Sequence, residues 1–528
     1  MPSSLSIQDH AIPASASEAT EPRGLAGGWF VPLLLAAISL ALWYPLRCGG
    51  PIQWDSVQFL LALDQYDIAK HLPHPPGYFL YVMLGRALRL VTGDGWSALL
   101  VLGGLCGAVL VAVTSRMASE IGGSFAGLLA GLMALTAPLL INDTTQGDTH
   151  SASGALSALV GWCALRLVVL RRRGPMEVIG GSVALAALAG VRPSDGVFLA
   201  PLWLVALAVS GRRPFLVGLV TAAMGTLAWV IAMGVMMGGY DGLFHTLSMI
   251  MSGFVTRRAP VTSGVRWLLP NGRLVAEGLE QLLLPGAPLV LAVPFAAHQT
   301  LRRPLSWLLL LGIVPSLAVY LLLHIGKMYY LLNVAALLWL AVALSGRWAV
   351  QRLQLRPTAL LTLLAPFLVL GGVTVHQTYR ERQTLEQSWK GAAAMTRQLD
   401  PDSSVVLSSS VPRESRAPDG GRPWDFRHAM YYLPRFPTYM YPTDDAATVG
   451  RFNAGWHRIT RYLETPIRLH GVRHVILTSH DLLRHLPPGC HVLDLRSGVL
   501  ELHLVPVDPS HPVILGPGWE LQCTPARP

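Results

Sequence analysis

The run GWFVPLLLAAISLALWYPL, from Gly28 to Leu46, decides which kind of protein this chain forms. It is uncharged and about as long as a helix must be to cross roughly 30 Å of hydrocarbon. Neither a Lys/Arg-rich segment nor a clear small-residue cleavage site accompanies it, so we expect a retained anchor rather than a removed signal peptide. The preceding residues 1–27 are rich in Ser, Ala, Glu and Pro without periodicity, which predicts a disordered cytoplasmic tail.

The composition of the whole chain agrees with this first segment. Of 528 residues, 52% are hydrophobic and only 13% are charged, whereas about a quarter of an average soluble domain is charged. The formal charge is +10, yet the arginines form short clusters between long apolar runs instead of one basic stretch. This pattern argues against a nucleic-acid partner and predicts a polytopic protein in a lipid bilayer.

Further apolar runs bring the expected number of transmembrane helices to about eleven. After the first run, the candidates are 96–115, 125–141, 151–170, 178–191, 197–209, 215–237, 282–297, 305–323, 329–343 and 358–375. A further run from Gly77 to Val91 is short and carries Arg86 and Arg89 on one helical face. We interpret it as an amphipathic helix at the outer interface, and a short tilted span is the alternative.

Charge sets the expected orientation. If Gly77 to Val91 does not span, the arginine clusters at 116, 171–173, 212–213, 302–303 and 347–356 all fall on the side of the N-terminus. The positive-inside rule then places the N-terminus in the cytoplasm and the chain after Val375 outside it. Arginine richness, together with the family resemblance described below, favours a multi-pass protein of a bacterial inner membrane.

The C-terminal region, from residue 377 to 528, is more polar and lacks long apolar runs. Strand-like stretches at 404–407, 474–478 and 499–505 predict a small extracytoplasmic α/β domain. Cys490 and Cys523 both lie in it and could pair if it is outside the cytoplasm. We therefore divide the chain into the tail 1–27, a membrane domain 28–376 with a large external loop 47–95, and the domain 377–528.

Several polar clusters converge on the outer face in this topology. The external loop supplies Asp55 and His74, and the other clusters lie at 146–150, 192–195 and 324–330. Charged residues at the edge of apolar segments are costly, on the order of 3 kcal/mol at mid-membrane, so they are candidate functional residues.

Each of these residues also has a purely structural interpretation. Asp55 and Asp148 could each cap a following helix. Arg192 could form an ion pair with Asp195, and Lys327 could extend to a lipid phosphate. The convergence of carboxylates and cations on one side of the membrane favours the functional interpretation.

The external loop resembles a known motif. Asp55-Ser56 followed by His74-Pro75-Pro76-Gly77-Tyr78 is similar to the GT-C superfamily of polytopic glycosyltransferases, and most similar to bacterial protein O-mannosyltransferase-like families. Phe79 stands where those families usually have Pro. The segments 324–333, 424–427 and 431–434 also resemble the late span and C-terminal domain of these families.

The resemblance implies transfer of a sugar, with inversion, from a polyprenyl-phosphate donor to an extracytoplasmic acceptor, which could be protein, lipid or glycan. Asp55 would be the general base, and Asp148 would orient the acceptor or assist a divalent metal ion, if one is used. Cations would stabilise the leaving phosphate. The substrate-binding residues implied are His74, Arg86, Arg192, His324, Lys327 and Tyr330.

Two other functions fit the same residues. A transporter or flippase could use the charges as a substrate path, although we find no evident inverted repeat. A non-catalytic scaffold could display the C-terminal domain. The sequence does not identify the sugar or the acceptor.

Overall fold

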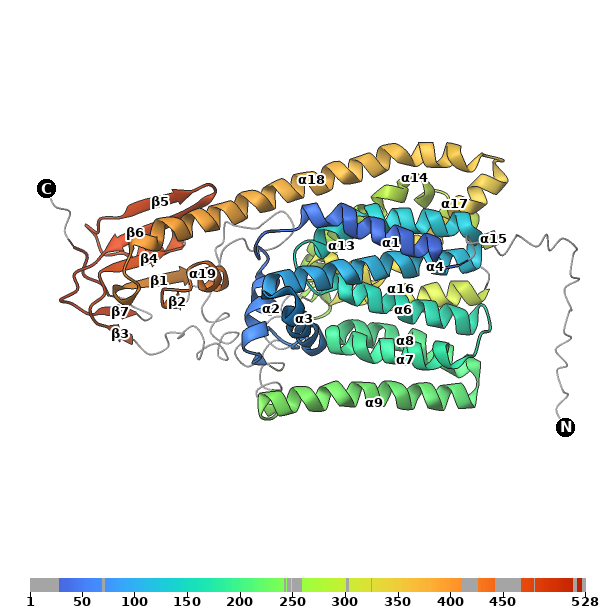
Figure 1. The fold of residues 1–528 in the computed structure, drawn as a ribbon, viewed down its shortest axis with the longest axis horizontal. Helices are drawn as coiled ribbons and strands as arrows, with labels where there is room; N and C mark the ends of the chain where they lie inside the picture. The colour runs from blue at the N-terminus through green and yellow to red at the C-terminus, as the bar shows by residue number, and fades with distance from the viewer. Residues whose placement is uncertain are drawn as a thin grey trace, which may run out of the picture.

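We describe the fold from a computed structural model. The residues described are 28–68, 72–241, 244, 248, 259–300, 303–323, 325–409, 426–441, 467–478, 480–515 and 520–524. Figure 1 shows a helical bundle joined by one long helix to a smaller part that contains β-strands.

Most helices lie side by side in the bundle. They are α1 (Phe30–Trp43), α4 (Gly95–Thr136), α5 (Pro138–Thr144), α6 (His150–Val168), α7 (Pro175–Val191), α8 (Pro193–Ser210), α9 (Arg212–Met237), α12 (Pro260–Ser263), α13 (Leu268–Leu283), α16 (Arg303–Leu322) and α17 (Ala335–Arg352). The chain is an integral membrane protein, because several of these helices are long and apolar.

The expected number of about eleven spans is wrong for the residues described. Six helices there are long and apolar enough to cross a membrane: α4, α6, α8, α9, α16 and α18 (Pro357–Met395). Two shorter apolar helical segments, Phe30–Leu46 and Pro175–Val191, accompany them.

Proline breaks account for part of the difference. The expected span 282–297 is divided into η6 (Leu284–Gly286), α14 (Ala287–Val290) and α15 (Val293–Thr300). Prolines at 285, 288 and 294 interrupt it, because proline lacks the N–H that a helix interior needs. The expected span 329–343 begins instead as the 3-10 helix η7 (Met328–Asn333) and continues in α17.

Two other expected spans, 96–115 and 125–141, lie largely within α4. Gly123 interrupts this helix with φ 72° and ψ 177°, a conformation that glycine adopts without steric cost. A Cβ atom added at Gly131 would lie 3.0 Å from the Cβ of Ser115. Residues so far apart along one straight helix could not touch, so the chain folds back at Gly123, and the helix counted once above comprises two helical segments that pack on each other.

The external loop contains two helices at one end of the bundle, α2 (Trp54–Asp64) and α3 (Phe79–Thr92). With 14 residues, α3 is about 21 Å long, shorter than the hydrocarbon layer. Its two arginines hold α2: Arg86 donates to the Ala62 carbonyl at 2.9 Å, and Arg89 pairs with Asp64 at 2.5 Å. The Arg86 contact therefore ties α3 to α2, whereas the Arg89 pair is exposed to solvent and contributes little.

The C-terminal region contains the small mixed sheet that the sequence predicts. Its strands lie in the order β2-β1-β4-β6-β5, with β1 parallel to β2 and β4, and β6 antiparallel to β4 and β5. The strands are β1 (Ser404–Ser409), β2 (Thr438–Tyr441), β4 (His474–Leu477), β5 (Leu493–Ser497) and β6 (Leu500–Pro506), and a separate pair is formed by β3 (Ile467–Leu469) and β7 (Val513–Leu515). Cys490 and Cys523 form a disulfide bond. The helix α18 packs on β5 and β6, and α19 (Phe426–Tyr432) packs on β1 and β2.

Candidate active site

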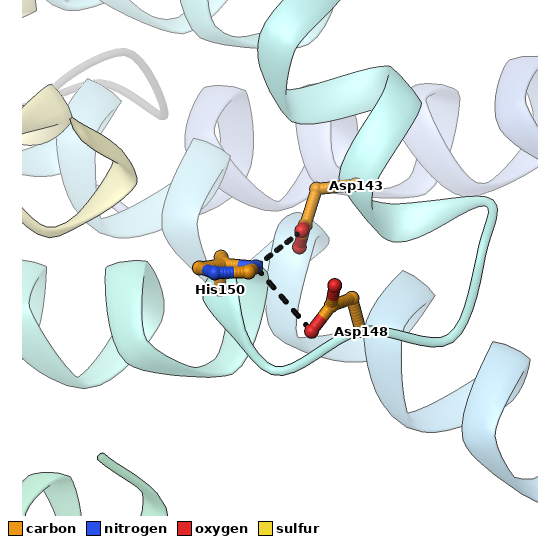
Figure 2. A group of neighbouring side chains, drawn as sticks. All are labelled: Asp143, Asp148 and His150. Atoms are coloured by element: carbon orange, nitrogen blue, oxygen red, sulfur yellow. Dashed lines mark hydrogen bonds and ion pairs between the residues drawn. The ribbon is translucent and has the colours of Figure 1, made fainter. Parts of the chain in front are cut away.

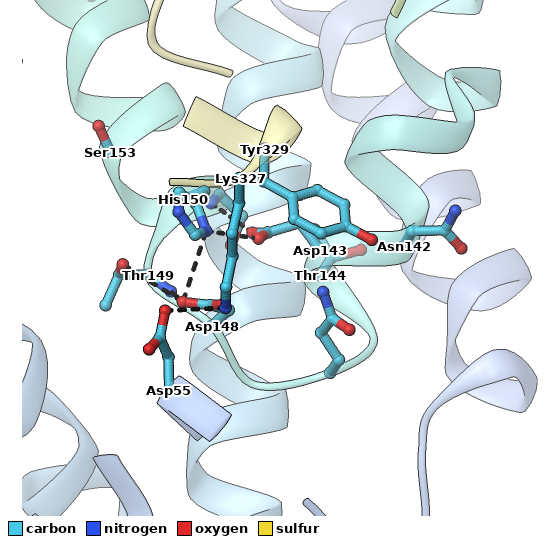
Figure 3. Close-up of polar contacts among 12 residues, drawn as sticks. Asp55, Asn142, Asp143, Thr144, Asp148, Thr149, His150, Ser153, Lys327 and Tyr329 are labelled. Atoms are coloured by element: carbon cyan, nitrogen blue, oxygen red, sulfur yellow. Dashed lines mark hydrogen bonds and ion pairs between the residues drawn. The ribbon is translucent and has the colours of Figure 1, made fainter. Parts of the chain in front are cut away.

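Three segments far apart in the sequence meet around one lysine. Lys327, just before η7, places its Nζ atom 2.8 Å from Oδ2 of Asp55 and 3.1 Å from Oδ2 of Asp148. Asp55 comes from α2, and Asp148 from the turn between α5 and α6. Figure 3 shows both carboxylates pointing toward the lysine. The arrangement is a buried ammonium ion shared by two carboxylates.

Local structure explains where each carboxylate lies. Asp55 is in the first turn of α2, but Gln53 is the N-cap residue and no side chain caps this helix. The capping interpretation of Asp55 is therefore wrong. Asp148 follows Gly147, whose φ of 67° turns the chain, and its carbonyl accepts a hydrogen bond from the Tyr81 hydroxyl at 3.1 Å. One oxygen of Asp148 accepts from the backbone N–H of Thr149 at 2.7 Å, which leaves the other for Lys327.

The charges at the site stabilise one another. Burial alone raises the pKa of Asp55, but Lys327 and His74 outweigh burial and hold that pKa below its usual value. The pKa of Asp148 is lowered in the same way, because Lys327 and His150 outweigh burial. Burial lowers the pKa of Lys327, but Asp148 and Asp55 outweigh it and raise that pKa well above its usual value. All three groups are therefore charged at neutral pH.

The two carboxylates differ in access to solvent. The Asp55 side chain is 14% exposed, whereas that of Asp148 is fully buried. Of the two carboxylates, only Asp55 can therefore meet an incoming substrate without a rearrangement of the bundle. Asp148 instead fixes the position of the ammonium.

His74 lies on the other side of Asp55, with its Nδ1 atom 3.8 Å from Oδ1. The Gln58 side-chain carbonyl accepts from the backbone N–H of His74 at 2.8 Å and lies 3.1 Å from Nδ1. Nε2 lies 3.1 Å from the Tyr78 hydroxyl. Burial lowers the pKa of His74 despite the opposing effect of Asp55. An oriented imidazole thus flanks the carboxylate.

A second cation, Arg192, lies at the junction of α7 and α8. Its Nε atom is 3.2 Å from Oδ2 of Asp195, which confirms the ion pair considered from the sequence. The guanidinium also donates to the Thr149 hydroxyl at 3.1 Å and lies 4.4 Å from the centre of the Tyr330 ring. It is therefore next to the turn that carries Asp148.

Asp143, Asp148 and His150 could hold a metal ion by residue type. One ligand atom from each lies within 4.8 Å of the others, and Figure 2 shows both carboxylates facing the same ring nitrogen of His150, at 3.0 Å from Asp143 and 3.4 Å from Asp148. However, Lys327 binds the free oxygen of Asp148, and its ammonium also fills the position between Asp148 and Asp55. A divalent ion there would be repelled by the ammonium at low local dielectric. The donor set therefore fits the internal lysine better than a divalent ion.

The structure brings together most of the residues that the sequence singles out. Asp55, Asp148, His74 and Lys327 are in direct contact, with Arg192 and Tyr330 beside them. Arg86 is bonded instead to α2 and to the Met236 sulfur. The last candidate, His324, lies outside the described residues.

Sequence reasoning overlooked two residues. Asp143 accepts from Nδ1 of His150 at 3.0 Å and from the backbone N–H of Ser151 at 2.6 Å, so it fixes the start of α6. Arg382 of α18 donates to the Tyr329 hydroxyl at 3.2 Å. Asp143 could have been found as an acid directly after an apolar run, but Arg382 lies in a polar sequence and gives no such signal.

Comparison with solved structures identifies the fold. The structure of ArnT from Cupriavidus metallidurans in the apo state has a TM-score of 0.61, 15% identity, and covers 91% of this chain and 98% of its own. ArnT bound to undecaprenyl phosphate has a TM-score of 0.61, 13% identity, and covers 90% and 97%. An apo oligosaccharyltransferase from Archaeoglobus fulgidus has a TM-score of 0.46 and 12% identity, and covers 85% and 69%.

No protein-family model and no curated protein sequence matches this chain. The likeness to ArnT extends over nearly the whole of both chains, so it includes the bundle and the C-terminal domain. The closer resemblance to protein O-mannosyltransferase-like families stays a prediction. The chain therefore has the same fold as ArnT from Cupriavidus metallidurans.

Proposed function

We propose that this protein is a membrane glycosyltransferase that moves a sugar from a polyprenyl-phosphate donor to an extracytoplasmic acceptor. The observation that carries the proposal is the partly exposed Asp55 carboxylate, held by Lys327 at one end of an apolar helical bundle. A long prenyl chain gains about 0.8 kcal/mol per buried CH2, so such a donor is met at the bilayer. The bound undecaprenyl phosphate in one ArnT structure supports this donor class.

In this proposal Asp55 is the general base. Its carboxylate takes the proton of the acceptor hydroxyl as the oxygen attacks the anomeric carbon, and the bond to the donor phosphate breaks on the opposite face. General base catalysis typically contributes roughly 10²- to 10⁴-fold. Inversion at the anomeric carbon follows from this single displacement.

The remaining residues orient Asp55 and stabilise charge. Asp148 holds Lys327, which in turn holds Asp55 in position. Arg192 is the candidate for contact with the leaving phosphate, since it is a fixed cation beside the same turn. His74 and Tyr330 lie where they could contact the sugar or the phosphate.

The test is release of free polyprenyl phosphate by the purified protein in lipid, from a panel of polyprenyl-phosphate sugars with membrane extract as acceptor. We expect release by the wild type and a loss of at least about 100-fold in Asp55→Asn. The matched control is Asp64→Asn, because Asp64 is on the same helix but is 69% exposed and pairs with Arg89. Normal rates are expected for this variant.

Two results would contradict the proposal. Equal rates in the wild type and Asp55→Asn would remove Asp55 as the base. No release from any donor by correctly inserted protein would favour transport over transfer. The donor that is consumed would identify the sugar.

A further inference from the structure

The C-terminal helix α19 holds the backbone that leads to Asp55. The Tyr432 hydroxyl donates to the Pro51 carbonyl at 3.1 Å, and Nε2 of His428 lies 2.8 Å from the Ile52 carbonyl. Both rings stack on Trp389 of α18, with interplanar angles of 10° and 11°. His428 is completely buried. Trp389 thus holds the two rings on one side, and on the other side they bind the carbonyls of Pro51 and Ile52.

The helix α18 contacts the same loop and the two other segments of the site. Glu386 accepts from the backbone N–H of Gly49 at 2.8 Å. Arg382 donates to the carbonyl of Asn142, at the end of α5, at 3.0 Å and to the Tyr329 hydroxyl at 3.2 Å. Both side chains are buried, although they lie in a polar sequence.

These contacts reach each segment close to its charged residue. Residues 49–52 precede Asp55, Asn142 lies in the helix that leads to Asp148, and Tyr329 lies two positions after Lys327. One C-terminal unit therefore touches all three segments that form the ion cluster. A unit that contacts all three can fix the distances between them.

We propose that Arg382, Glu386, His428 and Tyr432, called here the C-terminal clamp, are positioning residues that hold Asp55 against Lys327 for the reaction. Glu386, His428 and Tyr432 act through the backbone of the external loop, and Arg382 acts through Asn142 and Tyr329, so none of the four has to touch the substrate. The inference rests on the proposed function, since the positioned group is the proposed base. A displacement of about 1 Å at a reacting group can cost about 100-fold in rate.

The test compares kcat and KM for the donor in the full-length protein in lipid. We expect His428→Ala and Tyr432→Phe to lower kcat about 10-fold while KM for the donor stays within about twofold, because buried carbonyls lose their donors. His428→Gln keeps an N–H donor and should recover much of the rate. Tyr439→Phe is the matched control, since Tyr439 is buried in the same domain but packs in the sheet core.

Hydrogen–deuterium exchange of residues 47–60 tests the positioning without any activity. We expect faster exchange in His428→Ala and Tyr432→Phe, and wild-type exchange in Tyr439→Phe. If neither exchange nor kcat changes, or if the control loses as much rate as the clamp variants, the inference is wrong. It is also wrong if exchange rises but kcat does not fall.

The two proposals can fail separately. If the wild type releases no polyprenyl phosphate from any donor, the proposed function fails. Unchanged exchange in the clamp variants would then overturn the clamp as well, and faster exchange would still support its hold on the external loop.

Discussion

The two ends of α6 carry two buried charge clusters that differ in kind. Near its C-terminal end, Glu120 pairs with Arg116 at 2.9 Å, with Arg172 at 3.5 Å and with Arg166 at 3.9 Å. At its N-terminal end, one lysine is shared by two aspartates. A helix of 19 residues separates the clusters by about 28 Å.

The difference lies in which charge is in excess. Several guanidinium groups surround Glu120, and the Trp162 ring nitrogen also donates to it at 3.0 Å, so this carboxylate is fully occupied. At the other end the carboxylates outnumber the ammonium, and Asp55 keeps an exposed part. The first cluster joins helices, whereas the second keeps a carboxylate available for chemistry.

The largest expected effect on transfer comes from Lys327→Met. Removing the shared cation leaves two buried carboxylates unpaired, and breaking such a pair typically costs about 3–5 kcal/mol. We expect transfer to fall about 100-fold or more and the unfolding temperature to drop. The control is Arg172→Met, which removes a cation from the other cluster. We expect this variant to transfer at the wild-type rate. Normal transfer by Lys327→Met would show that the lysine is not needed.

The pH dependence of transfer should also distinguish the N-terminal cluster. The base must be ionised, so activity falls as pH falls through the pKa of Asp55, which Lys327 and His74 hold below its usual value despite burial and the opposing charge of Asp148. Since burial also lowers the pKa of His74, we expect the rate to be flat around neutral pH and to fall only toward acidic pH. A rate profile with a midpoint near pH 6.5 would show that the titrating group is not Asp55.

Glu120→Gln tests the structural assignment of the other cluster. The loss of a buried charge among arginines should destabilise the protein by about 3 kcal/mol. Thermal unfolding in lipid measures this change, and transfer per folded molecule should stay within about twofold. A large loss of specific activity would remove the distinction between the two clusters.

The smallest effect is expected from removing divalent metal ions. Because the ammonium of Lys327 lies between Asp55 and Asp148, chelation with EDTA should leave the transfer rate unchanged. A rate that falls with EDTA and returns with added metal would show that a divalent ion displaces the lysine. Metal analysis of the purified protein provides the independent measurement.

Local patterns predicted the parts of the structure that depend on local physics. Apolar runs predicted a membrane bundle, and the three strand-like stretches correspond to β1, β4 and β6. The charge asymmetry of the loops predicts that Asp55, Asp148 and Lys327 share one face, and in the structure the three side chains are in contact. The positive-inside rule counts charges over whole loops, so the predicted orientation does not depend on the exact boundaries of single helices.

The features that could not be predicted depend on contacts between distant segments. Within the described residues fewer helices are long and apolar enough to span than hydropathy predicts, partly because hydropathy does not distinguish a continuous helix from short pieces broken by prolines. Arg382 lies in a run of polar residues, and only its contacts reveal that it is buried. Asp143 lies just before the cluster 146–150. Its role depends on the fold of the chain, which brings His150 to 3.0 Å from its carboxylate.

Because α18 is one continuous helix, the orientation of the C-terminal domain relative to the bundle depends on the number of residues in this helix. This helix has 39 residues and is about 58 Å long, and it runs from the bundle to the sheet (Figure 1). Each residue inserted in its middle would rotate the domain by about 100° relative to the bundle, but would move it only about 1.5 Å along the axis. Insertions or deletions in this helix would therefore keep the orientation of the C-terminal domain only when their length is close to a whole number of helical turns.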